Sequence, residues 1–85
     1  MRHIIHEAVE SLLSGPLSGS KWRQYNAAQI HQMYIDEVLR LSKDIYQDKP
    51  FETTPFYALH IVVENKLKKS QSVSSSLEAL SQYIL

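Results

Sequence analysis

The chain has 85 residues, a formal net charge of zero and no cysteine, and 44% of its residues are apolar. A chain of this length forms one domain around one small core, so we expect a single domain over residues 1–85. The composition excludes a disordered chain and a disulfide scaffold, and the absence of a basic excess argues against a nucleic-acid-binding protein.

The first predicted helix runs from Arg2 to Leu13, because its apolar residues fall on one helical face. They are Ile5, Ala8, Val9, Leu12 and Leu13. Its charged residues interrupt the long apolar run that a secretory signal or a membrane span needs, so we expect neither. The segment at 14–20, SGPLSGS, contains both glycines of the chain and a proline, which predicts a loop that reverses the chain.

The segment from Trp22 to Tyr46 has neither glycine nor proline and predicts the longest helix of the chain. Its apolar stripe comprises Ala27, Ile30, Tyr34, Val38, Leu41 and Ile45, widened by Ile35 and Leu39. Such a broad apolar face predicts that several shorter helices lie against it. Ser18 or Ser20 is the predicted N-cap, and Pro50 is expected to end the helix near Asp48.

The third predicted helix has Thr54 as its N-cap and Pro55 at its first position, and it runs to about Lys69. The residues that it is expected to bury are Phe56, Leu59, Val62, Val63 and Leu67. In the turn before this helix, Phe51 is expected to fold back onto the core.

The fourth predicted helix follows a polar turn, and Ser75 and Glu78 have the spacing of a capping box. Its apolar residues are Leu77, Leu80 and Ile84. Four amphipathic helices joined by short turns predict an all-α fold, an antiparallel up-and-down four-helix bundle with a long second helix. Two alternatives stay open: a three-helix core with the last helix docked across it, and a core completed by dimerisation.

The histidines do not predict a metal site. His3 and His6 lie one helical turn apart, but no third and fourth ligand frames them. His31 lies off the apolar stripe and is predicted to be exposed. His60, beside the apolar Leu59, is predicted to be partly buried and hydrogen-bonded.

The carboxylates and serines do not suggest a catalytic arrangement either. Asp36 and Glu37 are adjacent and therefore point about 100° apart on a helix, whereas Asp36 and Arg40 have ion-pair spacing. The serines at 70–76 lie in no GxSxG motif, and no glycine-rich phosphate loop exists. We therefore predict a protein that is not an enzyme and that binds no cofactor and no metal.

Lys66, Lys68 and Lys69 form a cationic cluster at the end of the third predicted helix. Cations at this position stabilise the helix dipole and remain solvated. The same cluster can also dock an acidic partner or an anionic membrane surface. The helix that follows has no lysine or arginine and carries Glu78, so it does not fit a DNA-reading helix and no nucleic-acid partner is expected.

Taken as a whole, the sequence resembles the immunity proteins of pediocin-like (class IIa) bacteriocins, the enterocin A immunity group in particular. The likeness is spread over four segments: IIHEAVESLL, LSKDIYQDKP, ENKLKK and SLEALSQYI. It covers most of residues 3–84. Members of this family are small cytoplasmic four-helix bundles. The sequence differs from many of them in stopping at Leu85, without the C-terminal tail that they fold back onto the bundle.

The resemblance implies a cytoplasmic protein without catalytic activity that protects its cell from one or a few bacteriocins. In that family the immunity protein acts at the mannose-uptake permease after the bacteriocin has engaged it. Family specificity lies chiefly in the C-terminal half, which suggests a partner-binding surface around the ends of the last two helices. The predicted residues are Asn65, Lys66, Lys68, Lys69, Gln71, Gln82 and Tyr83. This reading favours a monomer and leaves weak association with a membrane surface open.

A second hypothesis is a small helical regulator or adaptor that dimerises through spare apolar surface. The residues proposed for that surface are Trp22, Phe51, Tyr83, Ile84 and Leu85. A nucleic-acid-associated regulator is a third option. Sedimentation separates a monomeric immunity bundle from a dimeric adaptor, and salt-dependent DNA binding would identify the third class.

Overall fold

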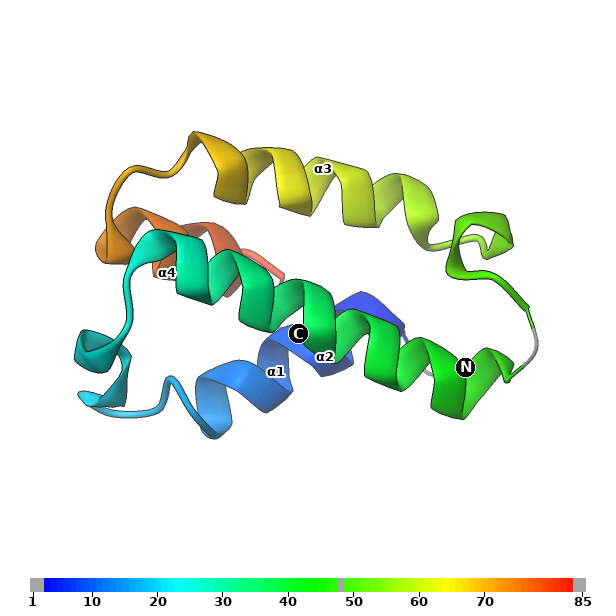
Figure 1. Cartoon of the computed structure of the whole chain (residues 1–85), viewed down its shortest axis with the longest axis horizontal. Helices are drawn as coiled ribbons and strands as arrows, with labels where there is room; N and C mark the ends of the chain where they lie inside the picture. The colour runs from blue at the N-terminus through cyan, green and yellow to red at the C-terminus, as the bar shows by residue number, and fades with distance from the viewer. Residues whose placement is uncertain (1–2, 48, 84–85) are drawn as a thin grey trace.

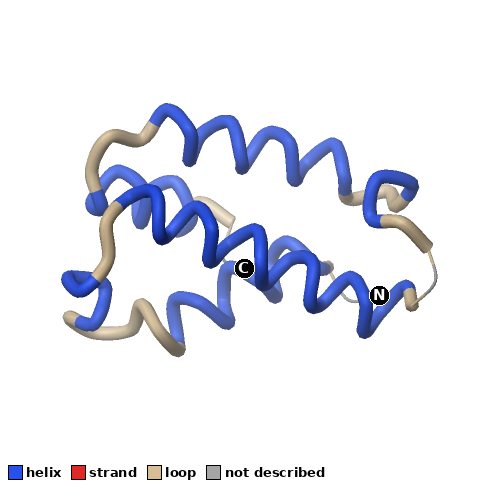
Figure 2. Tube along the Cα trace, in the orientation of Figure 1, coloured by secondary structure: helices blue, strands red, loops and turns tan. Residues whose placement is uncertain are grey.

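The computed structural model describes residues 3–47 and 49–83. These residues form four α-helices and two short 3₁₀ helices and contain no strand (Figure 2). In chain order the elements are α1 (Ile4–Ser14), η1 (Lys21–Gln24), α2 (Ala27–Tyr46), η2 (Phe51–Thr53), α3 (Tyr57–Lys69) and α4 (Val73–Ser81). The predicted all-α fold is therefore confirmed.

Successive helices run in opposite directions (Figure 1). The longest helix, α2, contacts α1, α3 and α4, and α3 also packs against α4. The last helix, α4, contributes Ala79 and Leu80 to the core. The antiparallel four-helix bundle with a long second helix is confirmed, and α4 is one of its four members.

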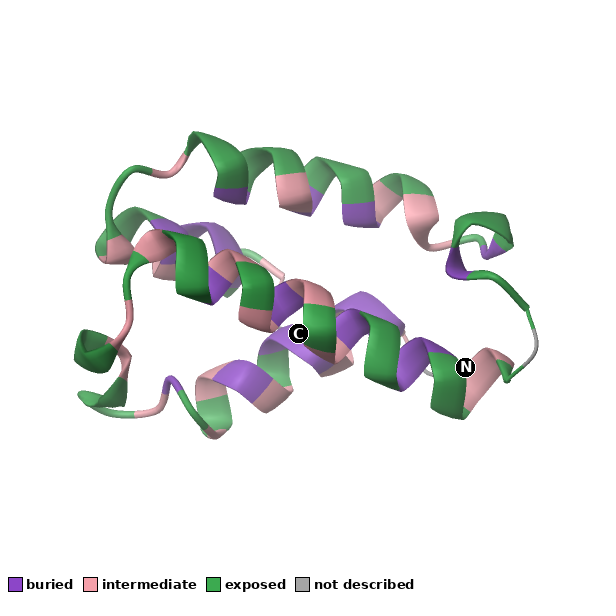
Figure 3. Cartoon of the chain, viewed as in Figure 1, coloured by how far each residue is buried: buried purple, intermediate pink, exposed green. Residues whose placement is uncertain are grey.

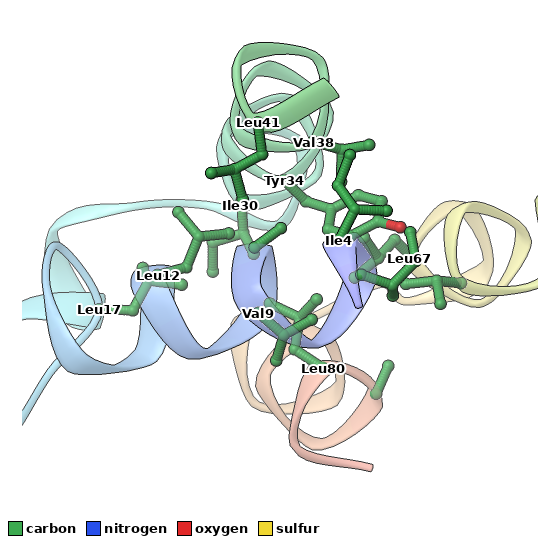
Figure 4. Close-up of a cluster of buried hydrophobic side chains, with 14 of the residues drawn as sticks. Ile4, Val9, Leu12, Leu17, Ile30, Tyr34, Val38, Leu41, Leu67 and Leu80 are labelled. Carbon is green, nitrogen blue, oxygen red and sulfur yellow. The ribbon is translucent and has the colours of Figure 1, made fainter. Parts of the chain in front are cut away.

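The core lies on the sides of the helices that face one another, as the buried positions in Figure 3 show. In Figure 4, Val9 of α1 lies close to Leu80 of α4, and Ile4 lies between α2 and Leu67 of α3. The buried apolar residues of the helices are Ile4, Ile5, Ala8, Val9, Leu12, Ile30, Tyr34, Val38, Leu41, Val63, Leu67, Ala79 and Leu80. Leu17 is also buried, so the predicted SGPLSGS loop is anchored to the core. Four residues of the predicted stripe of α2 are buried: Ile30, Tyr34, Val38 and Leu41. Its end residues Ala27 and Ile45 are partly buried, as is Ile35, whereas Leu39, which was predicted to widen the stripe, is 46% exposed.

The predicted start of the long helix is wrong by five residues. Trp22 lies in η1, and the extended backbone of Tyr25 and Asn26 separates this turn from α2. Asn26 is the N-cap: its side chain accepts from Gln29 N at 2.8 Å, and the Gln29 side chain accepts from Asn26 N at 2.8 Å. This reciprocal capping box satisfies two backbone donors at once, and Ser20 makes no capping hydrogen bond.

The predicted N-cap of the third helix is also wrong. The Thr54 hydroxyl donates backward to the carbonyl of Phe51 at 2.8 Å, and the helix begins at Tyr57. Val62 is 47% exposed although we predicted it to be buried, because it lies about 100° around the helix from the buried Val63. Phe51 is buried, as predicted.

The fourth helix begins earlier than predicted, because Ser72 and not Ser75 is its N-cap. The Ser72 hydroxyl accepts from Ser75 N at 3.1 Å, so Ser75 is the donor of the capping hydrogen bond. The predicted capping box of Ser75 and Glu78 is therefore wrong. Leu80 is fully buried and Leu77 partly buried, while the predicted core residue Ile84 lies outside the described residues.

The expected ion pair between Asp36 and Arg40 is not formed. Arg40 pairs with Glu37 at 2.6 Å and with Asp44 at 3.7 Å, and Asp36 accepts a hydrogen bond from Gln32. Glu37 also accepts from the Ser11 hydroxyl of α1. The Arg40 hydrogen bond lowers the pKa of Glu37, and Ser11 contributes to the same shift. Glu37 thus links α1 to α2 at the edge of the core.

Within residues 3–47 and 49–83, no helix combines the length and the apolar character that crossing a membrane requires.

Candidate partner-binding surface

Three lysines lie in the last turn of α3, as the sequence predicted. The four carbonyls at a helix C-terminus have no partner within the helix, and they favour cations nearby. Ser70, the C-cap residue, closes this end with its hydroxyl, which donates to the carbonyl of Lys66 at 2.9 Å. The lysines therefore project from an ordered helix end.

Lys66 is held by the C-terminal end of α4. Its Nζ donates to Oε1 of Gln82 at 3.0 Å and lies 5.2 Å from the centre of the Tyr83 ring. An ammonium group over an aromatic face at this distance makes a cation–π contact. The structure thus brings together three of the predicted partner-binding residues, although Gln82 and Tyr83 follow Lys66 by 16 and 17 positions in the sequence.

The other predicted residues are arranged differently. Lys68 pairs with Glu64 at 2.9 Å, which turns its ammonium toward α3 itself. Asn65, Lys69 and Gln71 are exposed, and none of the three makes a side-chain hydrogen bond or ion pair with another described residue. The predicted set therefore separates into an ordered group around Lys66, a paired Lys68, and three solvent-facing side chains.

Lys68 is also the outer end of a hydrogen-bonded chain that reaches the core. Oε2 of Glu64 lies 3.1 Å from Nε2 of His60, and Nδ1 of His60 lies 3.1 Å from the hydroxyl of Tyr34 on α2. We call Tyr34, His60, Glu64 and Lys68 the α2–α3 relay. Tyr34 is fully buried and His60 is 7% exposed, whereas the Lys68 side chain is 57% exposed. The relay thus connects the interior to the predicted surface.

Aromatic rings enclose the inner part of the relay. The His60 ring stacks on Tyr34 at 5.5 Å between centroids, and Phe51 meets it edge-on at 5.0 Å. Tyr57 lies 5.8 Å from His60 and also contacts Phe51. The predicted burial and hydrogen bonding of His60 are confirmed.

Burial and charge set the protonation states along the relay. Burial lowers the pKa of His60, and the opposing effect of Glu64 does not outweigh it. The hydrogen bond from Lys68 lowers the pKa of Glu64. Burial raises the pKa of the Tyr34 hydroxyl, with the Glu64 charge acting in the same direction. All three shifts favour the same states at neutral pH, namely a neutral Tyr34 phenol, a neutral His60 imidazole and an ionised Glu64 carboxylate.

His31 lies beside the relay, half-buried and not exposed as predicted. Its Nε2 atom is buried, without a hydrogen-bond partner among the described residues. A surface pocket of about 360 Å³ is lined by His31, Lys68 and residues of both helix ends. The other lining residues are Ala27, Ala28, Leu67 and Ser70. The start of α2 and the end of α3 therefore form one continuous surface.

His3 is the N-cap of α1, and its ring lies against that of His6. Nδ1 of His3 accepts from His6 N at 3.4 Å, and the two rings stack with centroids 4.0 Å apart. Burial, followed by the neighbouring His6, lowers the pKa of His3. Within the described part of the chain no group of three or more histidine, aspartate or glutamate side chains is placed to hold a metal ion.

The sequence reading missed two relay residues, Tyr34 and Glu64. One signal was present: His60, Glu64 and Lys68 follow one another at intervals of four, which places their side chains in a row on one helix face. Tyr34 was assigned to the core, and nothing local pairs it with His60, 26 residues later.

Comparison with protein-family models, with curated proteins and with solved structures finds no match to this chain.

Proposed function

We propose that this protein is a non-catalytic binding protein of the bacteriocin-immunity type. In this proposal it protects the cell from a pediocin-like bacteriocin by binding the mannose-uptake permease that the bacteriocin has engaged, from the cytoplasmic side. The proposal rests on the resemblance of the sequence and on the four-helix bundle, which is the architecture expected for that family. It requires no catalytic residue, cofactor or metal.

The observation that supports a binding role best is the contact of Lys66 with Gln82 and Tyr83. A lysine that is already held in place loses less side-chain entropy when a partner binds than a freely rotating one. The contact also joins the ends of α3 and α4, the region to which the family resemblance assigns specificity. Lys68 and Lys69 extend this positive surface, which suits an acidic segment of the permease complex or the anionic lipids around it.

The proposal predicts that charge reversal at Lys66, Lys68 and Lys69 abolishes protection. The triple glutamate variant is produced in a strain sensitive to pediocin-like bacteriocins, and survival is compared with that of the wild type. A matched control reverses Lys21, Lys43 and Lys49, which are exposed and lie outside α3 and α4. Far-UV circular dichroism checks that both variants keep their helices. Equal protection by both folded variants would exclude the predicted surface.

A dimeric regulator or adaptor is the second candidate, and exposed apolar side chains favour it. Ile61 and Val62 of α3 and Leu39 of α2 are exposed. Phe51, one of the residues proposed for this surface from the sequence, is buried and cannot belong to it. Trp22 and Tyr83 are partly buried, and Ile84 and Leu85 lie outside the described residues. A tight dimer in sedimentation at micromolar concentration, disrupted by Val62→Glu, would favour the adaptor over the immunity protein.

A further inference from the structure

Lys68 belongs both to the proposed binding surface and to the α2–α3 relay. Its ammonium lies 2.9 Å from Oε1 of Glu64, while Oε2 of the same carboxylate lies 3.1 Å from the His60 ring. Glu64 is thus shared between an exposed surface cation and a buried ring. A change at the surface that removes Lys68 leaves His60 as the remaining donor to that carboxylate.

The hydrogen-bond partners define the tautomer of His60. A carboxylate only accepts hydrogen bonds, so Nε2 of His60 carries the hydrogen that faces Glu64. Nδ1 then accepts from the Tyr34 hydroxyl, which is a donor in the same chain. The lone pair of Nδ1 is therefore the site where a further proton would be added.

We propose that an acidic peptide segment bound at the end of α3 draws Lys68 away from Glu64, and that His60 then takes up one proton from a buffer acid, whose conjugate base stays in solution. The proton binds at Nδ1, which becomes a donor to the Tyr34 oxygen while the tyrosine hydroxyl hydrogen turns away. The imidazolium is then paired with the Glu64 carboxylate, and no covalent bond between heavy atoms changes. This inference rests on the proposed function, because it uses the same surface. It adds that binding at this surface depends on pH through His60.

The groups around His60 determine how readily its ring takes up this proton. On α3 the Glu64 carboxylate favours the added proton, and Tyr57 lies against the ring. On α2, His31 disfavours the added proton on His60, and the Tyr34 oxygen can accept a hydrogen bond from Nδ1–H. Phe51 of η2 is apolar and excludes water. Removing the Lys68 charge leaves Glu64 uncompensated, which shifts the balance toward the protonated ring.

The first test needs no partner. The ring signals of His60 are followed by NMR during a pH titration of the wild type, of Lys68→Gln and of the control Lys69→Gln. Lys69 carries the same charge and is exposed, but it is not paired with Glu64. The expected result is a titration midpoint that rises by about half a pH unit in Lys68→Gln, a roughly threefold gain in proton affinity, and stays constant in Lys69→Gln. Equal midpoints in the two variants would overturn the proposal.

The second test uses a decaglutamate peptide as the acidic probe. At a saturating concentration it should raise the His60 midpoint in the wild type and leave that of Lys68→Gln unchanged. A peptide that fails to bind, or that binds without moving the wild-type midpoint, would overturn the proposal. These results do not depend on cell survival. If His60 responds as expected but the protein does not protect cells, the proposed immunity function is refuted and the proposed protonation of His60 is not.

Discussion

At the scale of single residues, His60 makes two hydrogen bonds that only a neutral ring can make together, since it donates at Nε2 and accepts at Nδ1. Burial lowers its pKa below the usual value of 6.5. The unfolded chain therefore binds more protons than the folded protein as the pH falls through 6.5, and folding becomes less favourable. The pKa of His3 is lowered too, so it acts in the same direction.

We therefore expect the free energy of unfolding, measured with urea, to decrease between pH 7 and pH 5. In His60→Gln the decrease should be smaller, because glutamine keeps one donor and one acceptor but does not titrate. The lowered pKa values of Glu37 and Glu64 add their own loss of stability mainly below pH 4.5, outside this window. A His60→Gln variant with the full wild-type pH dependence would contradict this assignment.

The Tyr34 hydroxyl provides a second test at the residue scale. Tyr34→Phe keeps the ring but leaves Nδ1 of the buried His60 without its donor, which should lower the free energy of unfolding by about 1–2 kcal/mol. Tyr46→Phe is the matched control, because this tyrosine is on the same helix and its hydroxyl has no hydrogen bond among the described residues. Equal effects of the two substitutions in urea titrations would argue against the hydrogen bond.

At the scale of helices and turns, side-chain caps set the boundaries. Asn26→Ala removes the acceptor for Gln29 N and breaks the capping box of α2, so we expect a loss of about 1 kcal/mol. Ser20→Ala, at one of the positions predicted from the sequence, should change stability by less than about 0.5 kcal/mol, since its side chain makes no cap. A larger loss of stability for Ser20→Ala than for Asn26→Ala would instead support the longer helix that the sequence predicts from Trp22.

These caps also show which parts of the fold could be predicted. The apolar periodicity of Ile30, Tyr34 and Val38 identifies the long helix and its buried side, because both depend only on spacing along the chain. The helix starts could not be chosen in the same way, because serine, threonine and asparagine compete as caps within a few residues. Thr54 illustrates this competition, since its hydroxyl bonds backward into η2.

The candidate site was predictable to a similar extent. The lysines and the spacing of His60, Glu64 and Lys68 are visible in the sequence. The contacts of Lys66 with α4 and of Tyr34 with His60 depend on how the helices pack, and no local pattern specifies them.

At the scale of the whole molecule, α4 completes the core. Leu80 is fully buried against residues that include Val9 of α1, so Leu80→Ala should lower the free energy of unfolding by about 2–5 kcal/mol. Val62→Ala removes exposed apolar atoms and should change it by less than about 0.5 kcal/mol. Chemical denaturation measures both. A small effect of Leu80→Ala would mean that α4 is dispensable for the bundle.

The bundle presents Lys66, Lys68 and Lys69 at one end of α3 while the chain as a whole has zero net charge. The proposed function depends on this local concentration of charge at one surface. It also depends on the ordered contact between α3 and α4, which positions Lys66.

The most direct test of the proposed function is survival of a bacterial strain that is sensitive to pediocin-like bacteriocins and produces this protein in its cytoplasm. The strain is challenged with a panel of these peptides, beside the same strain without the protein. The proposal predicts survival against one or two peptides and killing by the others. Killing by every peptide, with the folded protein present in the cell, would contradict it.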